Sequence, residues 1–74
     1  MLKFKVGDVI TVGKIEFRFD EFEGEGRFIG AVGEIIEAVE GVHPYQVGFY
    51  DKEIQKINKQ MGSRLFDEDE LNFL

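Results

Sequence analysis

The length of 74 residues fits one small domain, residues 1–74, and the net charge of −6 works against non-specific contact with nucleic acid. Hydrophobic residues form 43% of the chain, enough for one modest core, and the absence of cysteine excludes disulfides and thiolate zinc sites. No apolar run approaches the ~18 residues that a membrane span needs, so no membrane association is expected.

Alternating and β-branched segments indicate the first strands. Residues 3–6 alternate polar and apolar side chains, as a half-buried strand does. The β-branched residues 9–12 predict a second extended segment. Residues 15–22 alternate strictly until Phe22 breaks the phase, which indicates a bulge or the start of a loop. A flexible acidic turn is expected to follow at residues 23–26.

The longest strand-like stretch spans residues 27–40. Gly30 and Gly33 interrupt it, and a glycine inside a strand often marks a sharp bend or a close backbone approach, as at the corner of a small barrel. Residues 41–44 read as a loop, and residues 45–49 alternate again. This part of the chain predicts two further strands.

Residues 51–62 have the spacing of a helix rather than a strand. One apolar stripe is formed by Ile54, Ile57 and Met61. Asp51 is placed to cap the N-terminus of this helix and Gly62 to end it. We therefore expect a short amphipathic helix, with a hairpin excursion as the alternative.

The last residues return to extended structure. Leu65 and Phe66 indicate a brief strand, and residues 71–74 indicate a final one. Residues 67–70 between them are all acidic and predict a solvated turn, in the form of one 3₁₀ turn. The side chains expected to form the core are Phe4, Val6, Ile10, Phe17, Phe19, Phe28, Ile35, Val47, Phe49, Leu65 and Leu71.

Three local patterns resemble those of the Src-homology-3-like (SH3-like) small barrels, in particular the KOW and Tudor-like group. They are Phe-Lys-Val-Gly-Asp-Val-Ile at 4–10, Gly-Ala-Val-Gly-Glu-Ile-Ile-Glu at 30–37, and the closing series of 45–49 and 65–71. The resemblance implies a mostly β fold, a five-stranded antiparallel barrel. The helix at about 51–62 is inserted where the family has a tight turn between the third and fourth strands. The family includes nucleic-acid binders, peptide binders and structural modules, so the resemblance implies architecture and not function.

Residues suited to catalysis or metal binding are few. His43 is the only histidine, expected to be an exposed loop residue, and it has no partner at a recognised metal-ligand spacing. Ser63 and Thr11 are the only serine and threonine, and neither lies in a nucleophile motif. We therefore expect a protein that is not an enzyme, with no catalytic residue, metal or cofactor.

The first functional hypothesis is a small acidic protein-interaction module, a regulator or inhibitor of a larger protein. Its expected contact residues are Glu16, Asp20, Glu21, Phe22, Glu23, Glu25, Asp67, Glu68, Asp69 and Glu70. Such a face could occupy a basic channel, because electrostatic complementarity raises association rate and selectivity. The alternative is that these carboxylates only keep the domain soluble. The size and acidity are similar to those of short phage-encoded proteins.

Two other functions stay open. A nucleic-acid-binding module, which the net charge disfavours, would use Lys52, Lys56, Lys59, Arg64 and Tyr50. A structural subunit would self-associate through an unpaired barrel edge, and the oligomeric state is undetermined.

The expected location is the cytoplasm. A chain without cysteine suits a reducing compartment. Residues 1–6 also lack the unbroken apolar stretch of a secretory signal.

Overall fold

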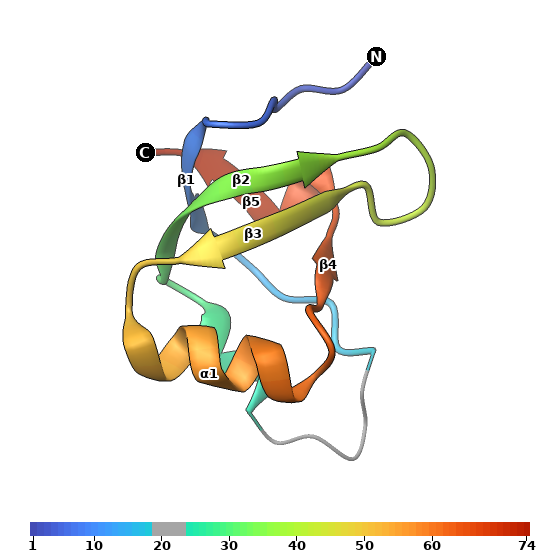
Figure 1. Cartoon of the computed structure of the whole chain (residues 1–74). Coiled ribbons are helices and arrows are strands. Elements are labelled where there is room, and N and C mark those ends of the chain that lie inside the picture. The colour runs from blue at the N-terminus through green and yellow to red at the C-terminus, as the bar shows by residue number, and fades with distance from the viewer. Residues whose placement is uncertain (19–23) are drawn as a thin grey trace.

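The computed structural model describes residues 1–18 and 24–74, which form a curled five-stranded antiparallel sheet with one helix (Figure 1). The elements in chain order are β1 (Val9–Val12), the 3₁₀ turn η1 (Glu25–Phe28), β2 (Val32–Ala38), β3 (Tyr45–Phe49), α1 (Lys52–Gln60), β4 (Leu65–Phe66), the 3₁₀ turn η2 (Glu68–Glu70) and β5 (Leu71–Phe73). The strands are ordered β4-β3-β2-β1-β5. The predicted mostly β fold of five antiparallel strands, with one short helix between the third and fourth strands, is confirmed. The sheet curls into a half-barrel, which is consistent with the expected SH3-like architecture.

The β2–β3 hairpin is the longest pairing in the sheet, and a glycine pair makes it possible. A Cβ atom on Gly33 would lie 2.5 Å from the carbonyl oxygen of Gly48, so no larger residue fits there. The expected close backbone approach is therefore confirmed. The strand begins at Val32 and not at residue 27, because η1 and Gly30, with a φ of +87°, come first.

The ends of α1 are fixed by the two residues that the sequence indicated. The side chain of Asp51 accepts hydrogen bonds from the N–H groups of Glu53 and Ile54 at 2.9 and 3.1 Å. Gly62 has a φ of +77°, and its N–H donates to the carbonyl oxygen of Lys59 at 3.0 Å. The helix is thus held at both termini independently of the sheet.

The apolar stripe of α1 faces the core, as predicted, with Ile57 buried. Asn58 beside it is also buried. Its Nδ2 donates to the carbonyl oxygen of Val47 at 3.3 Å, and its Oδ1 accepts from the N–H of Arg64 at 2.9 Å. These two bonds tie α1 to β3 and fix the segment that carries Arg64.

The buried core matches the predicted one in large part. Correctly predicted members are Phe4, Ile10, Phe28, Ile35, Val47, Phe49 and Leu71. Val6 is 62% exposed, Phe17 is 64% exposed and Leu65 is also exposed, so these three predictions are wrong, and Phe19 lies outside the described residues. In β4 it is Phe66, and not Leu65, that faces inward, because the two neighbours point to opposite faces of the strand.

Two segments expected to be strands, residues 3–6 and 15–18, are not part of the sheet. Their backbone N–H groups donate to side chains instead of to a neighbouring strand. The N–H of Phe4 donates to the hydroxyl of Tyr45 at 3.0 Å, and the N–H of Glu16 donates to a buried carboxylate. Side chains therefore satisfy the backbone that a β-ladder would otherwise pair.

Candidate protein-binding surface

Arg64 is a buried arginine whose charge is neutralised inside the fold. Its Nε donates to Glu25, and its Nη2 donates to Glu70 at 2.9 Å and to the carbonyl oxygen of Glu16 at 2.7 Å. The guanidinium carbon lies 4.6 Å from the centre of the Phe66 ring, a cation–π distance. Both carboxylates are as fully buried as the guanidinium, which meets the requirement that a buried charge be paired and hydrogen-bonded.

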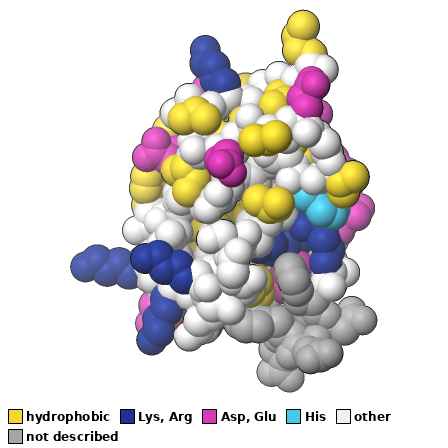
Figure 2. Space-filling model, turned by 45° about the vertical axis from the view of Figure 1, so that its right-hand side comes forward, with side chains coloured by type: hydrophobic (Ala, Val, Ile, Leu, Met, Phe, Trp, Pro, Cys, Tyr) yellow, Lys and Arg dark blue, Asp and Glu magenta, His cyan; other side chains and the backbone are white. Residues whose placement is uncertain are grey.

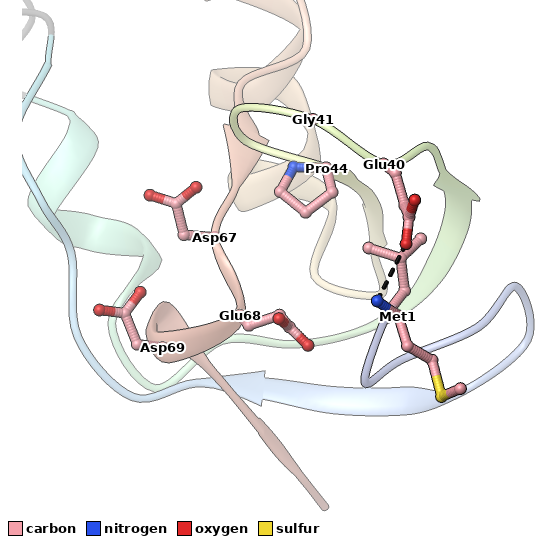
Figure 3. Close-up of a pocket in the computed structure, with 8 residues that line it drawn as sticks. Met1, Glu40, Gly41, Pro44, Asp67, Glu68 and Asp69 are labelled. Carbon is pink, nitrogen blue, oxygen red and sulfur yellow. Dashed lines mark ion pairs between the residues drawn. The ribbon is translucent and has the colours of Figure 1, made fainter.

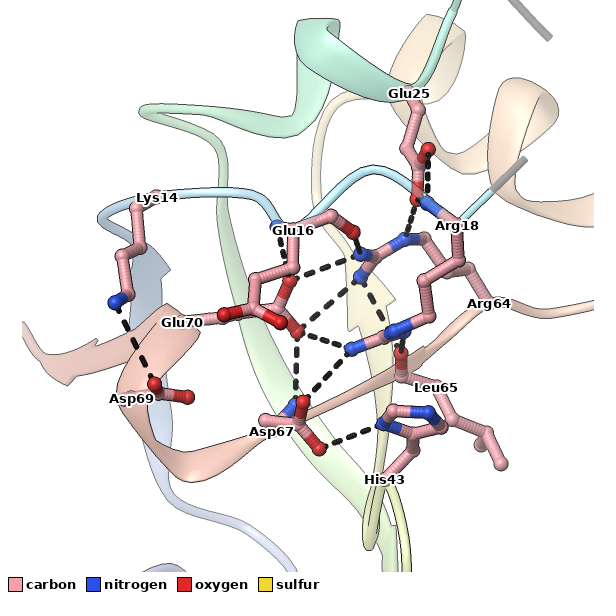
Figure 4. A network of polar contacts seen from close by, with 10 residues as sticks. All are labelled: Lys14, Glu16, Arg18, Glu25, His43, Arg64, Leu65, Asp67, Asp69 and Glu70. Atoms are coloured by element: carbon pink, nitrogen blue, oxygen red, sulfur yellow. Dashed lines mark hydrogen bonds and ion pairs between the residues drawn. The ribbon is translucent and has the colours of Figure 1, made fainter. Parts of the chain in front are cut away.

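Arg18 brings a second cation to the same place. Its Nη2 lies 2.7 Å from Glu70 and 3.1 Å from Asp67, and its Nη1 donates to the carbonyl oxygen of Leu65 at 2.5 Å. Two cations and three anions thus form one charge cluster, made of Arg18, Glu25, Arg64, Asp67 and Glu70 (Figure 4). Through these ion pairs and hydrogen bonds, the cluster connects the segment before residue 19 with η1 and with the η2 region.

His43 extends this network to the β2–β3 turn. Its Nδ1 lies 2.7 Å from Oδ1 of Asp67, and its backbone has a φ of +55° (Figure 4). The histidine is in a loop, as predicted, but it is half-buried and has a carboxylate partner, so the expectation of an exposed residue is wrong. The contact fixes the turn against η2.

The network lowers the pKa values of two carboxyl groups. Burial acts to raise the pKa of Glu70, but hydrogen bonds from Arg64 and from backbone N–H groups, together with the charge of Arg64, bring it below its ordinary value. Burial likewise opposes the shift at Asp67, where the hydrogen bond and charge of His43 and then Arg18 lower the pKa. Both groups are therefore stabilised in the ionised form.

This arrangement corrects the predicted acidic face. Glu25 and Glu70 are wholly buried, so they do not lie on an exposed surface, because Arg64 holds them inside. Glu16 and Asp69 are exposed, and two further members of the predicted set, Asp67 and Glu68, are half-buried. The remaining predicted contacts, Asp20, Glu21, Phe22 and Glu23, lie outside the described residues.

The surface carboxylates of η2 border a hollow of about 560 Å³ between the N-terminal residues, the β2–β3 turn and η2 (Figure 3). We call it the acidic groove, and it is lined chiefly by Leu2, Glu40, Pro44, Asp67, Glu68 and Asp69. Sequence reasoning missed Glu40 and Pro44. No local sequence pattern marks these two residues as part of a site. They become part of it only because the folded β2–β3 hairpin places its turn next to η2.

The carboxylates of the groove differ in how they are engaged. Asp67 and Asp69 turn toward Arg18 and Lys14, whereas Glu68 points into the space beside Pro44 (Figure 3). Glu68 has no ion pair among the described residues, although its Oε1 accepts the N–H of Lys3 at 2.7 Å. Within the described part of the chain, Glu40 pairs only with the exposed amino group of Met1 at 3.0 Å, an interaction of little strength in water.

Exposed hydrophobic side chains lie next to this groove. Val42 is 83% exposed and directly follows Gly41, which lines the groove, and Val39 on the same turn is also exposed. Figure 2 shows hydrophobic side chains gathered with acidic ones over the upper part of one face. The aromatic contact was expected at Phe22 instead, which lies outside the described residues. Phe17, which was expected in the core, is exposed, with its ring beside η1 near Gly26.

The residues of the alternative, nucleic-acid-binding hypothesis separate into two groups. Arg64 is buried in the charge cluster, so the expectation that it meets phosphate at the surface is wrong. The other four, Tyr50, Lys52, Lys56 and Lys59, line one hollow of about 360 Å³ together with Phe49 and Gln55. We call this second site the α1 hollow.

Comparisons of the chain with protein families, with curated proteins and with solved structures find no match. In residues 1–18 and 24–74, no three His, Asp or Glu side chains are grouped closely enough to hold a metal ion. The helix present in these residues is too short and too polar to cross a membrane.

Proposed function

We propose that this protein is a small protein-interaction module, a regulator or inhibitor of a larger protein, which holds a basic segment of its partner in the acidic groove. The observation that carries the proposal is that Glu40 and Glu68 line one hollow together with the apolar side chains of Leu2 and Pro44. A lysine or arginine side chain has the charge and the long apolar stem that suit such a site.

The neighbouring valines extend the same surface. An exposed apolar turn carrying Val39 and Val42 beside carboxylates is complementary to a segment in which apolar and basic residues alternate. The groove is open and shallow, which fits a transient contact better than an enclosed small-molecule site. Its carboxylates repel phosphate, so this face favours protein over nucleic acid. The proposal places this activity in the cytoplasm, which suits a chain without cysteine.

The test measures binding of a fluorescent peptide of alternating lysine and leucine by anisotropy. The variant Glu40→Gln/Glu68→Gln removes two groove charges and keeps the acceptor for the N–H of Lys3. We expect it to weaken binding about fivefold, in line with the modest strength of exposed charge pairs. A glutamate–leucine peptide is the negative control.

The matched control variant is Glu37→Gln/Glu53→Gln, which makes the same change in net charge at exposed positions away from the groove. It should bind the peptide as the wild type does. Equal weakening in both variants would mean that the peptide responds only to net charge, and the groove would be rejected as the site.

A further inference from the structure

The α1 hollow combines an apolar floor with a cationic rim. Phe49 is nearly buried at the end of β3, whereas the next residue, Tyr50, is 57% exposed. The lysines Lys52, Lys56 and Lys59 follow at helical spacing, so they stand on neighbouring turns of α1. Figure 2 shows basic side chains projecting together at the lower left, on the side where α1 lies.

None of these three lysines forms an ion pair with a described residue, whereas two other surface bases, Arg27 and Lys14, do. Arg27 lies 3.5 Å from Glu53, which belongs to α1, and Lys14 lies 3.4 Å from Asp69. The chain has 15 acidic and 9 basic residues, so unpaired lysines grouped on one helix are a marked local separation of charge. Lysines clustered along one helix are an electrostatic feature of polyanion sites, although the net charge of the chain opposes such binding.

The polar groups around the hollow are held in place before any ligand arrives. Oε1 of Gln55 accepts the N–H of Phe49 at 2.9 Å, which leaves its Nε2 amino group as a donor. The carboxylate of Asp51 is engaged with the N–H groups at the start of α1. Preorganised donors lower the cost of ordering side chains on binding.

We propose that the α1 hollow binds single-stranded nucleic acid, with a base against the ring of Tyr50 and phosphates at Lys52, Lys56 and Lys59. An aromatic ring beside a line of cations is the combination that such ligands require, because every base has a face to stack. The site is separate from the acidic groove, which lies at the opposite end of the β2–β3 hairpin (Figure 1).

The experiment is fluorescence anisotropy with a labelled oligothymidylate of about eight nucleotides, a length within the range of single-strand sites. With three phosphates neutralised, the logarithm of affinity falls with the logarithm of salt at a slope of about −2. Raising sodium chloride from about 20 to about 200 mM should therefore weaken binding about a hundredfold. Tyr50→Leu should weaken it about tenfold, through lost stacking.

Charge variants locate the site. Lys56→Glu/Lys59→Glu should abolish binding, whereas Lys5→Glu/Lys14→Glu, with the same net charge, should bind as the wild type does. Circular dichroism and thermal unfolding of each variant exclude a folding defect. The proposal is overturned if the wild type fails to bind at about 20 mM salt or if both double variants lose affinity equally. It is also overturned if an oligoglutamate of equal length binds as tightly as the oligothymidylate and Tyr50→Leu does not change the affinity for either. The α1 hollow would then be a site for acidic peptides. None of these outcomes bears on the acidic groove.

Discussion

Nη2 of Arg64 lies 2.9 Å from the carboxylate of Glu70, and neither side chain is exposed to solvent. A second buried carboxylate, that of Glu25, binds the same guanidinium. The η2 region and η1 are therefore joined through a buried guanidinium. The stability of this charge cluster depends on every member being present, because a charge that loses its partner remains buried.

We expect Arg64→Met to destabilise the protein by about 3–5 kcal/mol, because buried Glu25 would lose its guanidinium partner and buried Glu70 would keep only that of Arg18. Urea unfolding followed by circular dichroism measures the change. Arg27→Met is the matched control, since it removes an arginine from an exposed pair with Glu53. It should cost less than about 1 kcal/mol. Equal losses in the two variants would contradict the stabilising role of the cluster.

The lowered pKa values of Glu70 and Asp67 predict loss of stability in acid. A carboxyl group whose pKa falls on folding contributes its full stabilisation above its unfolded value, about 4, and loses it as the pH drops through the folded value. The free energy of unfolding should therefore decrease below about pH 4. Glu70→Gln should cost more at pH 7 than at about pH 3, because below the unfolded pKa part of the stabilisation from this charge is already lost in the wild type. Urea titrations at both pH values would refute this if the two losses were equal.

Gly33→Ala should destabilise the hairpin by about 1–3 kcal/mol, the cost of overpacking. The new Cβ atom would lie 2.5 Å from the carbonyl oxygen of Gly48 and 2.8 Å from a methyl group of Val47. Gly26→Ala is the control, because a Cβ atom there meets only the ring of Phe17 at 3.4 Å. Thermal unfolding compares the two, and a lower melting temperature for Gly26→Ala than for Gly33→Ala would be the opposite of this expectation.

Local signals in the sequence were sufficient for the elements that depend on local chemistry. The helix was predictable because Asp51 and Gly62 act within one turn of themselves. The strand at 45–49 was predictable because its alternation places Tyr45, Val47 and Phe49 on one buried face. Both features are read over a few residues, and neither depends on the rest of the fold.

The features that could not be predicted from the sequence depend on contacts between residues that are far apart in the chain. Residues 15–18 alternate like a strand, but the N–H of Glu16 pairs with Glu70, 54 positions away. In the sequence, Arg64 resembles the surface lysines near it. In the structure it is buried, because the fold surrounds it with carboxylates. The acidic groove likewise depends on Glu40 meeting η2 through the hairpin. A periodic pattern read over a few neighbouring residues cannot predict contacts between residues so far apart in the chain.

The charge cluster also affects how freely this sequence can change. Arg18 and Glu25 stand at either side of residues 19–23, and the N–H of Arg18 donates to the Glu25 carboxylate at 3.1 Å. Glu25 in turn binds the buried guanidinium of Arg64. A substitution at one of these positions therefore leaves another charge without its partner, and residues far apart in the chain are constrained to change together.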